Sequence, residues 1–135
     1  MVAAVFRTAA LALACAACTS IAVDSRTFEG TYWRVTAIDG EPTPASGDYR
    51  VSFENGRISG RFGCNSWSGA FAVTGERITA AQVVSTKMAC PEPAGRFEGR
   101  GLAVINQPMR WRWASGQELT LASGAGSILL VRQGP

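Results

Sequence analysis

After about thirty residues, the chain alternates hydrophobic and polar residues in short runs that turn residues separate, a pattern typical of antiparallel β-strands. In residues 31–39, for example, Trp33, Val35 and Ala37 share one face of an extended chain. The same alternation predicts further strands over residues 49–54, 57–63, 66–74, 77–82, 109–115, 118–123 and 127–133. The pattern therefore predicts a mainly β protein.

Turn residues set the connections between these strands. Asn55-Gly56 predicts a tight hairpin, because both central positions of a type I′ turn need a positive φ. Residues 40–48 contain two prolines and several other turn residues, and we expect a loop there.

Residues 92–106 break the strand pattern and predict one short helix. Phe97, Leu102 and Ile105 have roughly helical spacing, and two prolines just before them suit a first helical turn. Three glycines weaken this helix, each by up to ~1 kcal/mol relative to alanine. Short strands of near-regular spacing with one late helix favour an antiparallel barrel of about seven or eight strands, since closure removes exposed strand edges.

The first 22 residues have the pattern of an export signal. Arg7 supplies a positive charge, and the apolar stretch that ends at Ala17 is too short to span a bilayer but fits a secretory signal. We therefore divide the chain into a signal segment (1–22), a short linker (23–29) and one folded domain (30–133). This assignment predicts a protein of the cell envelope, in the periplasm or secreted.

Two cysteines in this segment raise the question of lipidation. The segment resembles a bacterial lipoprotein signal, in which a cysteine after small residues is lipidated and becomes the first mature residue. Cys18 follows Ala16 and Ala17 and fits this pattern better than Cys15. Cleavage after Ala22 would instead release a soluble protein. A lipid on Cys18 would hold the domain at a membrane without a spanning helix.

Composition excludes several classes of function. The formal charge of +3 and the lack of a basic run argue against nucleic-acid binding. The chain has no histidine, so the commonest general base and metal ligand is missing. The acids show no spacing typical of a metal site or an acid–base pair: Glu29, Glu41, Glu54, Glu76, Glu92, Glu98 and Glu118. We expect these acids to be solvated surface charges, and the protein to be a monomer without catalytic residues, cofactor or metal.

Two other constellations have a functional and a structural interpretation. Ser85 and Lys87 have the spacing of a Ser–Lys nucleophile pair, but such a pair needs a desolvated lysine and an oxyanion hole. Residues 110–113 (Arg-Trp-Arg-Trp) place two indoles on one face of a strand, either as a stacking platform for a ligand or as core tryptophans with solvated arginines opposite. We favour the structural interpretation of both.

Two stretches, residues 59–71 and 84–93, together with Trp33 in the first strand, are similar to the META domain, also called the HslJ-like family. The motif residues that carry this resemblance are Trp33, Gly63, Cys64, Asn65, Ser68, Gly69, Ser85, Thr86, Lys87, Met88 and Cys90, followed by Glu92, Glu98 and an apolar run over residues 128–131. Ser66 and Phe71 stand where the family often has Arg and Tyr. The resemblance implies a small barrel-like fold with one helix, in envelope or secreted proteins tied to stress tolerance or motility, with no established enzymatic activity.

Cys64 and Cys90 are the cysteines left in the folded domain of an exported chain, where thiols oxidise, so we expect a structural disulfide rather than a redox pair. The leading hypothesis for function is a non-enzymatic envelope protein that binds another envelope component. An inhibitor of a secreted hydrolase such as lysozyme, with residues 68–71 as a protruding loop, is an alternative. A hydrolase that uses Ser85 and Lys87 is the third.

Overall fold

The computed structural model describes residues 27–134, so the signal segment with Cys15 and Cys18 lies outside the described residues. It contains nine strands and one helix. In chain order these are β1 (Thr31–Ile38), β2 (Glu41–Pro42), β3 (Tyr49–Glu54), β4 (Arg57–Phe62), β5 (Ser66–Thr74), β6 (Arg77–Ser85), α1 (Ala94–Ile105), β7 (Met109–Ser115), β8 (Glu118–Ser123) and β9 (Gly126–Gln133). Among these residues there is no helix with the length and hydropathy needed to span a bilayer.

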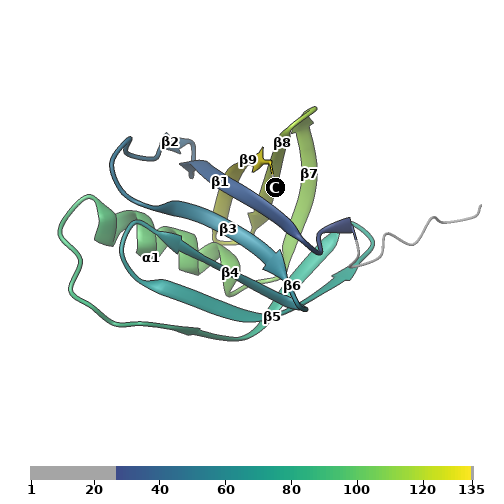
Figure 1. Cartoon of the computed structure of the whole chain (residues 1–135), viewed down its shortest axis with the longest axis horizontal. Coiled ribbons are helices and arrows are strands. Elements are labelled where there is room, and N and C mark those ends of the chain that lie inside the picture. The colour runs from purple at the N-terminus through teal and green to yellow at the C-terminus, as the bar shows by residue number, and fades with distance from the viewer. Residues whose placement is uncertain (1–26, 135) are drawn as a thin grey trace, which may run out of the picture.

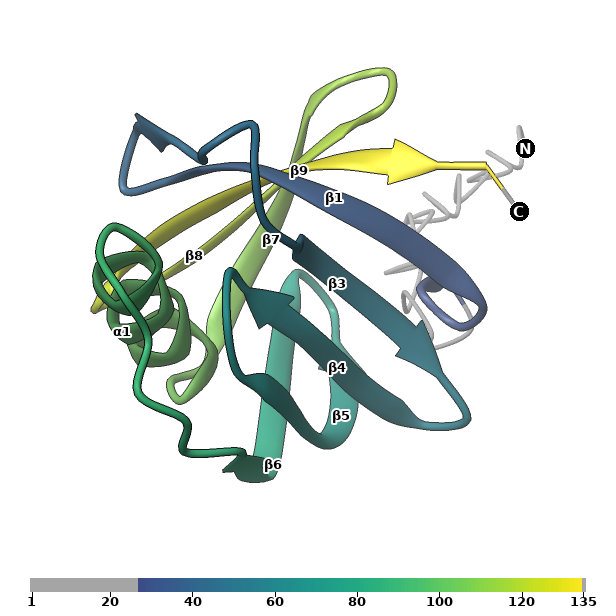
Figure 2. The same ribbon diagram turned by 60° about the vertical axis from the view of Figure 1, so that its left-hand side comes forward.

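The strands from β3 to β9 each pair antiparallel with the next, and β9 pairs back onto β1 (Figures 1 and 2). The result is a closed eight-stranded barrel, to which the two-residue β2 adds a short edge beside β1. Both Asn55 (φ 54°) and Gly56 (φ 71°) have positive φ, as the hairpin between β3 and β4 requires. The predicted barrel fold with one helix is confirmed.

The interior of the barrel is filled by side chains. The alternating residues of neighbouring strands point inward and leave the other face of each strand to solvent. Fully or almost fully buried members of this core include Phe28, Trp33, Val51, Phe53, Phe62, Trp67, Phe97, Met109, Leu119, Leu121, Ile128 and Leu130.

The core also begins earlier and alternates less regularly than the sequence indicated. Phe28, in the segment expected to be a linker, packs its ring 5.1 Å from that of Phe53. In β1 the register with β9 shifts between Val35 and Ala37, and Ile38 rather than Ala37 is fully buried. The prediction that Ala37 shares the inner face was wrong, because an extra residue at a bulge turns the following side chains over.

Helix α1 packs against one end of the barrel, between β4 and the β8–β9 hairpin (Figure 2). Its buried residues are Phe97, Gly101, Val104 and Ile105. A Cβ at Gly101 would lie 2.5 Å from the ring of Phe62 on β4, so the glycine lets the helix backbone approach that ring. By contrast, a Cβ at Gly99 would meet nothing within 4 Å.

The two helix glycines should therefore respond in opposite directions to the same substitution. We expect Gly99→Ala to raise the free energy of unfolding by up to about 1 kcal/mol, because alanine is the better helix former. Gly101→Ala should lower it by about 1–3 kcal/mol, because its methyl group overpacks against Phe62. Chemical denaturation of both variants measures the difference; a Gly101→Ala protein more stable than the parent would contradict this account of the packing.

Candidate functional site

The motif residues converge on one buried side chain, Asn65, which is 3 % exposed. Its amide nitrogen donates to the carbonyl of Met88 (3.1 Å) and to Glu98 Oε2 (2.9 Å). Its amide oxygen accepts from the backbone N–H of Met88 (2.8 Å) and the hydroxyl of Thr86 (2.9 Å). One side chain therefore holds the segment after β6 in the way that a neighbouring strand would.

The same cluster connects the barrel to the helix. The backbone N–H of Asn65 donates to Glu98 Oε1 (3.1 Å) on α1, so both oxygens of this carboxylate bind one residue. Cys64 and Cys90 form the expected disulfide, across a sequence separation of 26 residues. The prediction that every acid is a solvated surface charge was wrong for Glu98, which is half-buried; sequence spacing does not show which acid faces the motif.

The Ser–Lys pair is not assembled in this structure. Ser85 is the last residue of β6, which extends beyond the predicted end at residue 82, and Lys87 follows outside the strand with an exposed side chain. Within residues 27–134 no hydrogen bond joins the two side chains. The side chain of Lys87 is exposed to solvent, and the hydroxyl of the adjacent Thr86 donates to the amide oxygen of Asn65.

The remaining motif positions are also structural. Residues 68–71 lie within β5, where Gly69 pairs with Ile58 and Phe71 is buried, so the prediction that they form a protruding loop was wrong. Their buried and more exposed side chains continue the alternation of the strand, so these residues remain part of its extended backbone. The Trp33 indole donates to Thr31 Oγ1 at 2.8 Å inside the barrel.

The two tryptophans of β7 differ from each other. Trp111 packs on the core, and its indole N–H donates to the carbonyl of Gly75 (3.0 Å). Trp113 lies farther along the β7–β8 hairpin and is 48 % exposed, with its ring centroid 6.0 Å from that of Trp33. The arginines beside them are exposed. The structural interpretation therefore applies to Trp111 but only in part to Trp113.

Other acids also have structural partners. Glu41 forms ion pairs with Arg96 (3.0 Å) and Arg100 (2.6 Å) on α1, and the Glu29 carboxylate accepts from the backbone N–H of Gly56 (3.2 Å). In the part of the chain that the structure describes, no three Cys, Asp or Glu side chains form a group that could hold a metal ion.

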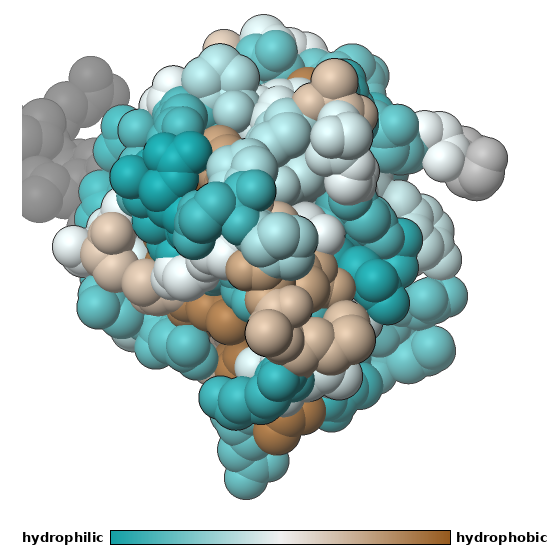
Figure 3. Space-filling view, turned by 90° about the vertical axis from the view of Figure 1, so that its left-hand side faces the viewer, coloured by the Kyte–Doolittle hydropathy of each residue, from teal (hydrophilic) through white to brown (hydrophobic). Residues whose placement is uncertain are grey.

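On the α1 face of the molecule, hydrophobic surface is gathered near the centre and is surrounded by hydrophilic atoms (Figure 3).

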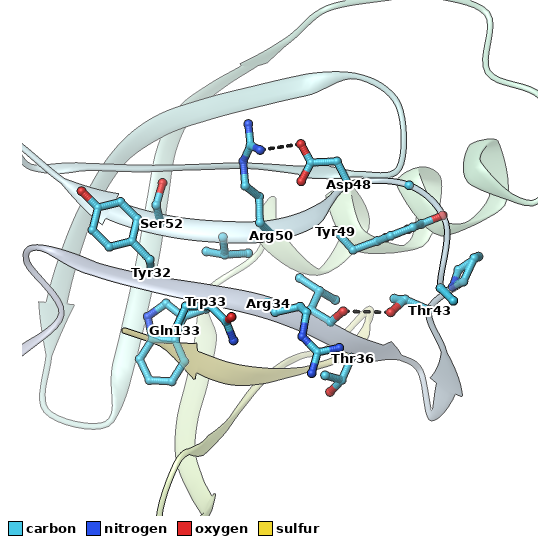
Figure 4. A pocket seen from close by; sticks show the side chains of 15 residues that line it. Tyr32, Trp33, Arg34, Thr36, Thr43, Asp48, Tyr49, Arg50, Ser52 and Gln133 are labelled. Atoms are coloured by element: carbon cyan, nitrogen blue, oxygen red, sulfur yellow. Dashed lines mark hydrogen bonds and ion pairs between the residues drawn. The ribbon is translucent and has the colours of Figure 1, made fainter. Parts of the chain in front are cut away.

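A pocket of about 560 Å³ opens on the outside of the barrel, where β1 and β3 separate (Figure 4). These strands pair only from Thr31 to Arg34, and residues 43–48 then form one wall of the pocket. Thr43 fixes this wall, because its hydroxyl donates to the carbonyl of Val35 (2.8 Å) and its N–H to that of Thr36 (3.0 Å). The pocket is thus built into the connection that follows β2.

Polar side chains of β1, β3 and β9 line this pocket, among them Tyr32, Arg34, Arg50 and Gln133. The Tyr32 hydroxyl donates to Glu54 at 3.0 Å; this hydrogen bond, and then the negative charge of Glu54, raises the pKa of the phenol. Sequence reasoning missed the pocket. Arg34 and Arg50 stand at outward positions of predicted strands, but the sequence does not show that these strands separate beside a loop.

Removal of the Asn65 side chain tests whether this cluster holds the fold. Asn65→Ala leaves the backbone groups of Met88 and one oxygen of Glu98, Oε2, without their partner, and we expect it to lower the free energy of unfolding by about 3 kcal/mol. The matched control is Asn106→Ala, at an exposed position after α1, which should change it by less than about 0.5 kcal/mol. Urea denaturation of the two variants, compared with the parent, measures both values. Equal stability of the Asn65 and Asn106 variants would show that the cluster does not carry the fold.

Comparisons with known proteins agree with this architecture. No curated protein sequence matches the chain. In fold it is similar to an NMR structure of a protein from Burkholderia xenovorans, with a TM-score of 0.68 and 21 % identity over 82 % of this chain and 87 % of that one. A second NMR structure has a TM-score of 0.70 and 20 % identity, over 81 % of this chain and 94 % of the other. A family model described as META domain matches residues 26–134, and the chain therefore belongs to the META domain family.

Proposed function

We propose that this protein is an exported, non-enzymatic binding module of the cell envelope, and that the pocket between β1 and β3 is its binding site. The observation that carries the proposal is that the motif cluster around Asn65 and the pocket lie on different parts of the barrel wall. Asn65 and Thr86 of the family motif join the segment after β6 to α1, whereas the pocket on another part of the wall carries the exposed side chains of Arg34 and Arg50.

The filled interior supports an external site. The inward side chains of the barrel are almost completely buried and pack on one another, so a ligand would displace core residues to enter. The pocket on the outer face needs no such displacement. Its size lies within the range of small-molecule sites, about 300–1,000 Å³.

Two features of the chain support export: the N-terminal segment and the disulfide. The N-terminal segment has the charge and length of a secretory signal. The Cys64–Cys90 disulfide suits an oxidising compartment outside the cytoplasm. A lipid on Cys18 would keep the domain at the membrane surface through a short tether.

The intact mass of the protein from membrane and soluble fractions of its own host tests export and anchoring together. We expect a chain that begins at lipidated Cys18 in the membrane fraction, with a mass lower by two hydrogens for the disulfide. Cys18→Ser should move the protein out of that fraction, whereas the control Cys15→Ser should not.

Three results would count against parts of this proposal. An uncleaved chain in the cytoplasm would contradict the proposed export. A cleaved but lipid-free chain beginning at Val23 would contradict only the proposed lipid anchor. Turnover of an ester or peptide substrate that Lys87→Ala abolishes would replace the non-enzymatic function with hydrolysis.

A further inference from the structure

We propose that the pocket between β1 and β3 binds an oxyanion, a carboxylate or phosphate group, through Arg34 and Arg50. This inference rests on the proposed binding function, because it names the ligand class of the same pocket. It follows from the arrangement of charges on the outer face of the barrel.

Three arginines stand in one row across neighbouring strands. Arg34 on β1 is the direct partner of Arg50 on β3, and Arg50 is in turn the direct partner of Arg61 on β4. Side chains directly opposite each other on antiparallel strands lie close together, and like charges in such positions repel. This row therefore favours a compensating negative charge beside it.

One carboxylate compensates only part of the row. Asp48 Oδ2 lies 2.5 Å from Arg50 Nη1 and 3.9 Å from Arg61 Nε, so it is shared by these two arginines. In residues 27–134 no carboxylate oxygen lies within 4 Å of a nitrogen of Arg34. Figure 4 shows Arg50 reaching toward Asp48, while Arg34 extends along the other side of the pocket. The positive charge that remains uncompensated thus lies at the pocket.

The geometry of guanidinium groups suits an oxyanion. Each presents several N–H donors in a planar fork, which matches the paired oxygens of a carboxylate or phosphate. Arg34 is exposed, and Arg50 is bound only to an acid at the surface, so both can turn toward a ligand. Tyr32 and Pro44 give the pocket apolar flanks for the uncharged part of such a molecule.

Asp48 would compete with a bound oxyanion for Arg50. It occupies one donor site of Arg50, and its negative charge repels an incoming anion. An oxyanion would compete with Asp48 for Arg50, while Arg34 supplies a second anchor. The wall that carries Asp48 is held to β1 through Thr43, so the competition does not require the pocket to unfold.

Titration of the protein with small probes, followed by 15N NMR, tests the inference directly. The probes are inorganic phosphate, benzoate and the neutral analogue benzamide. We expect phosphate and benzoate to shift the backbone resonances of Arg34, Asp48 and Arg50, and the shifts to weaken as salt rises, because salt screens exposed charges. Benzamide should leave these resonances unchanged at the same concentrations.

Substitutions that remove a positive or a negative charge at the pocket should change the affinity for benzoate in opposite directions, which a general loss of structure would not do. Arg34→Gln should weaken benzoate binding by about 10-fold or more, the usual effect of losing a charge-assisted hydrogen bond. Asp48→Asn should strengthen it, because Arg50 loses its internal competitor. The matched control is Arg112→Gln on β7, an exposed arginine away from the pocket, which should leave the affinity unchanged.

A second arm identifies the source of the oxyanion. Phosphatidylglycerol vesicles offer phosphate headgroups at a membrane, and phosphatidylcholine vesicles are the zwitterionic control. Sedimentation with the first that Arg34→Gln reduces, but Arg112→Gln does not, would identify a lipid headgroup as the ligand. Binding of soluble probes without sedimentation would identify a soluble anion.

Two outcomes would overturn the inference. Equal shifts with benzamide and benzoate would make the pocket apolar in its preference, and no shift with any probe together with no sedimentation would exclude an oxyanion site. Either outcome leaves the mass measurement of the proposed function unaffected, since export and anchoring do not depend on the ligand. If instead export fails and anion binding persists, only the location of the binding module changes.

Discussion

The fold depends on a single buried amide, the side chain of Asn65. A buried amide must satisfy both its donors and its acceptor, and Asn65 does so with groups from two other segments, the residues after β6 and the helix. This requirement fixes where the chain leaves the barrel wall and where α1 is placed against it. The disulfide from the neighbouring Cys64 to Cys90 covalently ties the connection between β4 and β5 to the segment after β6.

This constraint explains the family motif in physical terms. Asn65 contacts the hydroxyl of Thr86, the backbone of Met88 and the carboxylate of Glu98, whereas the side chain of Lys87 is exposed. A sequence signature often marks a reactive site, and the Ser-Thr-Lys order invites that interpretation here. In this protein it marks the place where a loop and a helix are joined to a barrel.

The barrel and the pocket follow from different parts of the same wall. The inward side chains pack on one another in the core, and closure of β9 onto β1 leaves the outer face as the accessible surface. Where β1 continues past β3 to pair with β2, the wall splits and the loop before Asp48 lines the gap. The charges at this split are unbalanced because three strands bring an arginine to the same row and one acid faces them.

Local patterns in the sequence predicted the eight strands of the barrel, the hairpin at Asn55-Gly56 and the single helix, because alternation, turn chemistry and helical spacing are local properties. The cysteine pair was also predictable, since the other two cysteines, Cys15 and Cys18, lie in the segment predicted to be a signal. Contacts between distant segments were needed to show that Ile38 replaces Ala37 in the core, that Gly101 leaves space for the ring of Phe62 and that Glu98 faces Asn65. It likewise brought Arg34 beside Arg50, sixteen positions apart along the chain. These facts depend on bulges, close approaches and strand pairing between distant segments, which no local pattern of residues specifies.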